Sequence, residues 1–210
     1  AATLKKMPDH IPEGIVDRIE AVSDVLPVPL APMSVEASQL SGAPLQVLWN
    51  HRWEYDKAPE RLFAAIKRVL SSGVELELHI VGQQFRKLPP VFAEMESYLR
   101  EFYPGAIKHW GFIEEFSEYQ RLLSSCDVVL STALHDFQGI AVLEAVAAGC
   151  LPLLPSRLCY GEWFDPEYLY GSFDDSDQEA QALAAKLTEL AAIKAAGELP
   201  ASPSVGGFSM

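Results

Sequence analysis

The sequence is short of cysteine, of positive charge and of long apolar runs. Its three cysteines are odd in number and lack CxxC spacing, which argues against a disulfide framework or a zinc site and favours buried thiols in a reducing, cytoplasmic setting. With 16 Lys and Arg against 29 Asp and Glu, the net charge is −13, which disfavours a protein that coats nucleic-acid phosphates. No apolar run approaches the roughly 20 residues that a membrane span requires.

What is present fits a globular domain with flanking segments, because 49% of the 210 residues are hydrophobic. The chain begins without Met or a signal region, so we expect a piece of a longer protein. Ile11–Val22 has the spacing of one short helix, and the prolines of Val25–Leu30 predict extended backbone. We expect residues 1–40 to be a linker-like segment, 41–197 a patterned domain and 198–210 a flexible tail.

The patterned domain alternates short apolar segments with longer amphipathic ones. Five segments are predicted to be strands: Leu45–Trp49, Leu76–Val81, Ile107–Trp110, Val128–Leu130 and Leu151–Leu154, the last with a proline that suggests an edge or an irregular end. The predicted helices are Ala58–Leu70, Pro90–Phe102, Phe116–Leu123, Ile140–Ala148 and Asp177–Ala195. This alternation predicts an α/β fold, a Rossmann-like parallel sheet with helices on both faces. Ligands of such sheets bind outside the carboxyl ends of the strands.

The loop after the first predicted strand carries two cations, Arg52 and Lys57, five residues apart. A guanidinium fork and an ammonium that point into one crevice suit a diphosphate. The alternative is a solvated loop whose cations pair with Glu54, Asp56 and Glu60.

The loop after the fourth predicted strand leads through Gly139 into an apolar helix. Glycine lets the backbone approach a ligand closely, and the first N–H groups of a helix favour phosphate. Glu144 lies within that apolar helix, where a carboxylate needs hydrogen-bond donors. Ligand hydroxyls would serve, and the alternative is a salt bridge to a buried Arg or Lys. Asp136 has an alternative role as a helix cap.

Together these residues resemble a known family. Asp136 and Glu144, eight apart around Gly139, resemble the Glu-x7-Glu signature of retaining group 1 glycosyltransferases with the GT-B fold. Arg52 and Lys57 match that family's Arg-x4-Lys, and further matches are Leu78–Gly82, Trp110–Phe112 and Cys126–Ser131. Asn50–Glu60, Ala133–Gly139 and Met7–His10 are similar to its tRNA-queuosine mannosyltransferase branch. Two departures are Asp136 in place of Glu, and Phe137–Gln138 in place of Gly-Phe.

The resemblance implies a role for each site residue. Arg52 and Lys57 would hold the diphosphate and stabilise the leaving group. Glu144 would accept hydrogen bonds from the ribose, and Asp136 from the transferred sugar. The remaining candidates are Gly139, Ile140 and Ala141 for backbone amides, Gln83, Phe112 and Ile113 for the walls around the base, and His135 for the sugar. No metal or other cofactor is implied, because the nucleotide sugar is a substrate.

The resemblance also implies a donor, an acceptor and a missing half. The expected reaction transfers mannose from GDP-mannose to queuosine in tRNA; the alternative uses a UDP-sugar and a glycolipid or small-molecule acceptor. Residues 1–40 would be a remnant of an N-terminal domain and the interdomain linker, so we expect the fragment to be inactive alone. Any tRNA would be held by that domain, or by a patch such as Arg86–Lys87. A flavodoxin- or receiver-like module is a third alternative, although Asp127 precedes its strand and lies at the wrong end for a phosphoacceptor.

Overall fold

The apolar segments form one parallel sheet, as the sequence predicts. The computed structural model describes residues 12–31 and 43–208, so Met7–His10, Ile11 and most of the linker-like stretch up to Pro44 lie outside the described residues. The strand order is β3-β2-β1-β4-β5-β6, and all neighbours run parallel. The strands are β1 (Leu45–Asn50), β2 (Leu76–Val81), β3 (Ile107–Gly111), β4 (Val128–Leu130), β5 (Leu151–Pro155) and β6 (Leu169–Tyr170).

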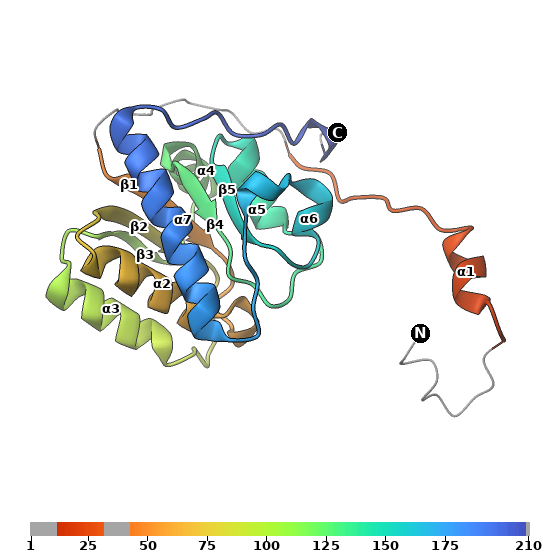
Figure 1. The fold of residues 1–210 in the computed structure, drawn as a ribbon, viewed down its shortest axis with the longest axis horizontal. Helices are drawn as coiled ribbons and strands as arrows, with labels where there is room; N and C mark the ends of the chain where they lie inside the picture. The colour runs from red at the N-terminus through yellow and green to blue at the C-terminus, as the bar shows by residue number, and fades with distance from the viewer. Residues whose placement is uncertain (1–11, 32–42, 209–210) are drawn as a thin grey trace.

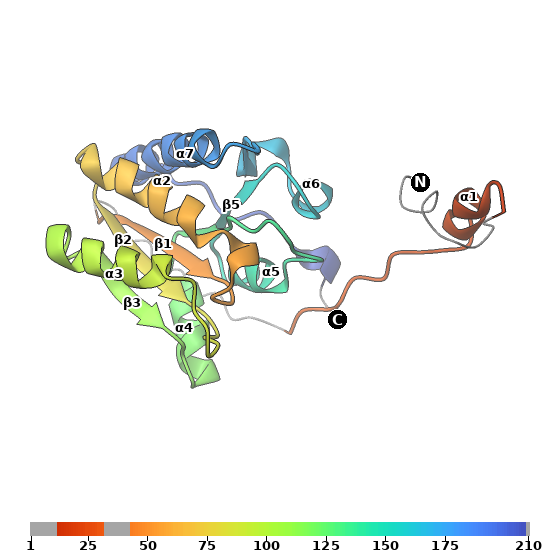
Figure 2. The ribbon, with the colours of Figure 1, turned by 90° about the horizontal axis from the view of Figure 1, so that it is seen from below.

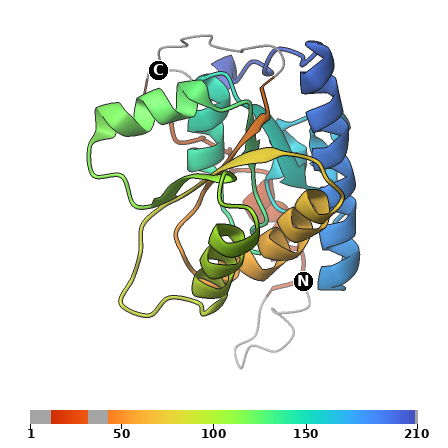
Figure 3. The same cartoon turned by 90° about the vertical axis from the view of Figure 1, so that its left-hand side faces the viewer.

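The helices cover both faces of the sheet (Figure 2). One layer holds α2 (Pro59–Ser71), α3 (Val91–Phe102) and α7 (Ser176–Ala196), with α7 running beside α2 (Figure 3). The other holds α4 (Phe116–Ser125), α5 (Ile140–Ala147) and the short α6 (Tyr160–Trp163). Each layer buries its own apolar cluster: successive residues such as Val47 and Leu48 of β1 fall in different clusters. Strands buried on both faces favour apolar residues throughout, as β4 and β5 show most clearly.

Gly82 brings the ends of the central strands close together. β1 and β2 pair in register from Leu45↔Leu76 to Asn50↔Val81, so both strands end at the same edge of the sheet. Gly82 follows with φ +148°, and a Cβ placed there would lie 1.8 Å from the carbonyl oxygen of His51. Only glycine permits this approach. The loop after β1 therefore contacts the loop after β2, and the N–H of Trp53 donates to the carbonyl of Gln83 at 2.9 Å.

Of the two expectations for Pro152, an edge strand or an irregular end, the edge strand is wrong. β5 lies between β4 and β6. The N–H of Leu151 and the carbonyl of Leu153 bond toward β4, so the backbone of Pro152 faces the other side. On that side β6 pairs only with Leu154 and Pro155, beyond the proline. The missing N–H of Pro152 therefore removes no bond from the sheet.

The flanking segments differ from the sequence expectation. α1 (Ile15–Glu20) is shorter than predicted, buries no residue and stands apart from the sheet (Figure 1). Beyond Gly197, where the pattern predicted no packing, Leu199 packs against one apolar cluster, and Val205 and Phe208 pack against the other. Over residues 12–31 and 43–208, none of the helices has the length and apolar content to cross a membrane.

Candidate functional site

Two adjoining cavities open at the edge where the parallel strands end. The first cavity, of about 330 Å³, is lined by Asn50, His51, Arg52, Val81, Gly82, Gln83, Phe112, Ile113, Glu114, Phe116 and Tyr119. The second cavity, of about 510 Å³, is lined by Val25, Leu26, Pro27, Val28, Asn50, His51, Arg52, Lys57, Asp136, Phe137, Gln138, Gly139, Ile140, Ala141, Glu162 and Trp163. Three residues at the end of β1 line both cavities, so one elongated ligand can occupy the two together.

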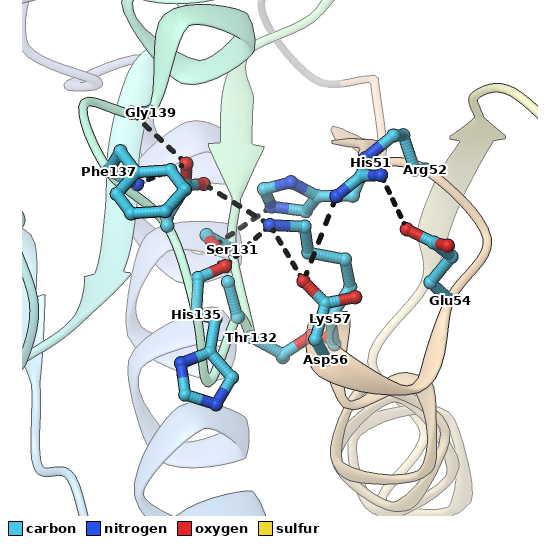
Figure 4. A network of polar contacts seen from close by, with 12 residues as sticks. His51, Arg52, Glu54, Asp56, Lys57, Ser131, Thr132, His135, Phe137 and Gly139 are labelled. Carbon is cyan, nitrogen blue, oxygen red and sulfur yellow. Dashed lines mark hydrogen bonds and ion pairs between the residues drawn. The ribbon is translucent and has the colours of Figure 1, made fainter.

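Lys57 is a buried cation at the second cavity. Its side chain is only 8% exposed, and Nζ donates to the carbonyl oxygen of His135 at 2.5 Å. Two carboxylates flank it, Asp56 with Oδ2 at 3.3 Å and Asp136 with Oδ2 at 3.7 Å (Figure 4). The short 3₁₀ turn Tyr55–Lys57 places the ammonium there, and the left-handed Ala58 (φ 46°) then starts α2. The loop after β1 thus supplies one fixed positive charge.

Arg52 is the second cation and is about half exposed. Its guanidinium lies 2.7 Å from Oε2 of Glu54 and 4.0 Å from Oδ2 of Asp56 (Figure 4). The structure therefore combines the two interpretations of this loop, cations that face a cavity and cations paired with acidic neighbours. The cations pair with Glu54 and Asp56, although no ion pair with Glu60 occurs among the described residues, and the same cations line the second cavity.

The carboxylate of Asp136 is turned onto its own loop. Oδ1 accepts from the N–H groups of Phe137 at 3.1 Å and Gly139 at 3.2 Å, as a capping residue does. Oδ2 accepts from the hydroxyl of Tyr160 at 3.1 Å. A carboxylate oxygen accepts about two hydrogen bonds, so Oδ1 is full and Oδ2 retains room for one more donor.

A buried chain of hydrogen bonds leads from Asp136 to His51. Tyr160 has one hydroxyl hydrogen and donates it to the carboxylate, so the 2.8 Å bond between Tyr160 and Ser131 must use the hydrogen of Ser131. The 2.9 Å contact between Ser131 Oγ and His51 Nε2 is then donated by the imidazole. Burial lowers the pKa of His51 to about 4, although the nearby Asp136 carboxylate opposes this. His51 is therefore neutral at pH 7, with its hydrogen on Nε2.

The first turn of α5 faces the second cavity. Gly139 precedes it with φ 73°, and a Cβ there would lie 3.0 Å from the ring of Tyr160. The N–H of Gly139 is taken by Asp136, whereas those of Ile140 and Ala141 have no acceptor within the described part of the chain. Asn50 fixes this turn to β1, because its Nδ2 donates to the carbonyl of Ala141 at 2.8 Å. Two backbone donors are thus free for an anion.

Glu144 lies one helical turn beyond Ala141 and is partly buried. The expected alternative, a salt bridge to a buried Arg or Lys, is not found in the described residues, where its carboxylate has no hydrogen-bond or ion-pair partner. Burial raises the pKa of Glu144. The carboxylate lies near Tyr119, which itself receives a hydrogen bond from Asn50 at 3.0 Å. Such an unpartnered acceptor suits ligand hydroxyl groups.

The residues proposed for the base gather at the first cavity. Gln83, Phe112 and Ile113 all line it, with Phe112 58% exposed and Ile113 buried. His135 is placed differently: its carbonyl holds Lys57, whereas its imidazole points away from the polar network (Figure 4). Among residues 12–31 and 43–208, no group of three His, Cys, Asp or Glu side chains is arranged to hold a metal ion.

This combination of fold and site agrees with a family comparison. Residues 45–192 match the family model described as glycosyl transferases group 1. The chain belongs to this family. The match spans the sheet, the first cavity and all of the second cavity except Val25–Val28, and it confirms the resemblance drawn from Asp136, Glu144, Arg52 and Lys57.

Two curated relatives of this group 1 glycosyltransferase are mannosyltransferases. The chain is 31% identical over 179 residues to a tRNA-queuosine alpha-mannosyltransferase of Drosophila melanogaster, covering 80% of the chain and 46% of the relative. It is 32% identical over 116 residues to a GDP-mannose-dependent phosphatidylinositol dimannoside mannosyltransferase of Mycobacterium tuberculosis, covering 54% of the chain and 28% of the relative. The chain thus spans about half the length of the first relative, and less of the second.

A solved structure shares the fold. The C-terminal domain of a group 1 family glycosyl transferase from Francisella tularensis superimposes with a TM-score of 0.60 at 19% identity, covering 73% of this chain and 81% of that one. The architecture is therefore that of the C-terminal domain of GT-B transferases.

A buried ionic cluster behind the site was not predicted from the sequence. Glu179 of α7 lies 2.5 Å from both Arg61 and Arg157, with only 1% of its side chain exposed. Arg157 also donates to the carbonyls of Thr132 at 3.0 Å and Ala133 at 2.8 Å, where the loop after β4 begins. The one sequence signal was Arg157 itself, a charge two residues after the apolar β5. The contact between Tyr160 and Ser131 was not predicted either, because it depends on the fold.

Proposed function

We propose that this group 1 glycosyltransferase binds GDP-mannose and forms the donor half of a retaining enzyme that transfers mannose to queuosine in tRNA. The observation that carries the donor assignment is the second cavity. Two cations and the free N–H groups of α5 face it, and the unpartnered Glu144 lies one turn further along α5. Mannose and queuosine are supported by the names of the relatives, at 31% and 32% identity.

In this proposal the diphosphate lies between Arg52, Lys57 and the first turn of α5. As the sugar leaves, negative charge develops on the nucleoside diphosphate. Preorganised cations and backbone dipoles stabilise such charge without reorganising. Because Lys57 is held by His135, Asp56 and Asp136, its ammonium is already in place before the ligand arrives. The two cations take the role that a divalent metal has in other transferases, so we propose a reaction without metal.

The two carboxylates then contact the sugars on either side of the diphosphate. Glu144 accepts hydrogen bonds from the ribose, because it has no protein donor among the described residues. Asp136 has one acceptor position left on Oδ2 for a hydroxyl of the transferred mannose. The base occupies the first cavity against Gln83, Phe112 and Ile113. Acceptor binding falls to residues outside this chain, which spans 46% of its Drosophila relative.

Calorimetric titration with GDP, GDP-mannose, UDP and UDP-glucose tests the donor assignment. We expect the guanosine ligands to bind, and Glu144→Ala and Arg52→Ala each to weaken them about ten-fold, the loss of one or two hydrogen bonds to charged groups. The matched controls, which also replace an arginine and a glutamate by alanine, are Arg100→Ala and Glu101→Ala near the C-terminal end of α3. Chelator should leave binding unchanged.

The outcomes separate the candidate functions. Selective binding of UDP or UDP-glucose keeps the enzyme class and favours a glycolipid or small-molecule acceptor. Appreciable sugar transfer by the chain alone contradicts the proposal that the acceptor site lies elsewhere. No binding of any nucleotide contradicts the donor assignment.

A further inference from the structure

Gln138, in the loop between β4 and α5, is hydrogen-bonded to a segment 110 residues earlier in the chain. Its Oε1 accepts from the N–H of Val28 at 2.7 Å, and its Nε2 donates to the carbonyl of Val28 at 2.8 Å. A neighbouring strand would bond one residue in the same way, through both its N–H and its C=O. The two bonds fix the orientation of the amide, since exchanging nitrogen and oxygen would place donor against donor.

The segment Val25–Leu30 presents its backbone N–H donors along one edge. Proline has no N–H and favours extended backbone in the residue before it, so the sequence Pro27-Val28-Pro29-Leu30 has donors only at Val28 and Leu30. In an extended chain these alternate donors point to the same side. Both are used: Val28 bonds Gln138, and the N–H of Leu30 donates to the carbonyl of Phe208 at 2.8 Å.

The same segment forms one side of the second cavity. Its residues from Val25 to Val28 line the cavity together with Arg52 and Lys57. Gln138 lies between this segment and Gly139, the residue that starts α5. A ligand that contacts the first turn of α5 therefore also meets backbone whose position depends on the Gln138 amide.

We propose that Gln138 is a positioning residue, which holds the Val25–Leu30 segment as a wall of the diphosphate cavity and so raises the affinity for the nucleotide sugar. The part that concerns the nucleotide rests on the proposed function. Contacts from the wall are available to the ligand only while the segment is held, so ligand and Gln138 favour the same arrangement. Binding of the nucleotide and ordering of Val28 are then reciprocally coupled.

Amide hydrogen exchange, followed by NMR on the 15N-labelled 210-residue chain, tests the contact directly. We expect the amides of Val28 and Leu30 to be protected in the wild type, and GDP to slow exchange at Val28. Gln138→Met keeps the length of the side chain and removes both hydrogen bonds. It should speed exchange at Val28 about ten-fold and leave Leu30 protected by Phe208.

The same variant tests the role in binding. Gln138→Met should weaken GDP roughly three- to ten-fold, the range that one or two partly exposed hydrogen bonds support. Gln138→Asn, with the same amide one methylene shorter, should behave like Gln138→Met because it cannot span both groups of Val28. Gln181→Met, on an exposed turn of α7, is the matched control and should bind GDP as the wild type does.

Each unfavourable result has a separate meaning. Rapid exchange of Val28 in the wild type overturns the contact itself. Protection of Val28 with unchanged GDP affinity in Gln138→Met overturns the positioning role. Failure of the wild type to bind GDP, UDP or their sugars rejects the proposed function and the positioning role together, while the exchange at Val28 still decides the contact.

Discussion

Tyr160 donates a hydrogen bond to Oδ2 of Asp136 across 3.1 Å, from a helix that follows the neighbouring strand. The same hydroxyl accepts from Ser131, which in turn accepts from His51. The carboxylate expected to contact the transferred sugar is thus oriented by a buried chain that ends beside the first cavity. Its position depends on a tyrosine that does not line either cavity.

Tyr160→Phe should therefore weaken the binding of GDP-mannose more than that of GDP, because in the proposed binding mode only the sugar nucleotide reaches Asp136. We expect about a five- to ten-fold loss for GDP-mannose, the usual effect of one hydrogen bond to a charged group. Paired titrations of both ligands measure it. The control is Tyr170→Phe, which removes an equally buried hydroxyl that bonds the carbonyl of Ser131 at 2.9 Å. Equal losses for GDP and GDP-mannose in Tyr160→Phe would reject this role.

Glu179→Gln should destabilise the fold strongly, because it leaves Arg61 and Arg157 buried without a counter-charge. Removing one partner of a buried ionic cluster costs about 3–5 kcal/mol. Urea unfolding of the variant measures the loss. Asp177→Asn provides the comparison: it breaks an ion pair with Arg68 at the same 2.5 Å on the same helix, but Asp177 is 73% exposed. That pair should contribute less than about 1 kcal/mol, and similar losses in both variants would contradict the argument.

The stability of the fold should fall as the pH falls from about 6.5 to 4. Burial lowers the pKa of both His51 and His79 from 6.5 to about 4. Within this window the unfolded chain binds protons at these two histidines and the folded chain does not, so protons favour unfolding. Each histidine contributes about 1 kcal/mol per pH unit.

Urea unfolding between pH 7.5 and 5 measures this slope. His79→Gln should reduce it by about half, since one of the two buried imidazoles is removed. A stability that does not change between pH 6.5 and 5 would exclude neutral buried histidines.

Gly82→Ala should disrupt the site even if the sheet survives. Its Cβ would lie 1.8 Å from the carbonyl oxygen of His51, so the loops after β1 and β2 must separate. We expect a loss of more than about 3 kcal/mol in unfolding free energy and loss of GDP binding. Gly73→Ala has positive φ as well but nothing within 4 Å, and should cost only about 1–2 kcal/mol. Comparable unfolding transitions in the two variants would contradict this.

Local pattern was sufficient for the elements of the sheet. β2 was predicted with its bounds, because in Leu76–Val81 apolar residues alternate with Glu77 and His79 and the segment ends at Gly82. α7 was predicted as Asp177–Ala195, within one residue of its bounds at each end. Asp175 caps its start by accepting from two backbone N–H groups, and the left-handed Gly197 caps its end. Placement of Arg52, Lys57 and Gly139 at one edge followed from the rule for parallel strands.

Contacts between distant residues could not be predicted in this way. Gln138 and Val28 are 110 residues apart, and no local sequence pattern around either residue predicts their contact. Leu199, Val205 and Phe208 are too sparse to show a helical or strand period, although they pack against the apolar clusters. β6 has two residues and lacks a pattern of its own. Such features depend on the finished fold, in which a single side chain finds a partner.

If the two cations bind a diphosphate as proposed, their acidic partners determine how it reaches them. Arg52 and Lys57 lie among Glu54, Asp56 and Asp136, so the immediate surroundings carry three negative charges against two positive ones. With a net charge of −13 on the chain, long-range attraction does not steer the diphosphate to this site, and added salt should not slow its association. The incoming phosphates must instead exchange places with carboxylates, and discrimination between donors falls mainly on how slowly each one dissociates.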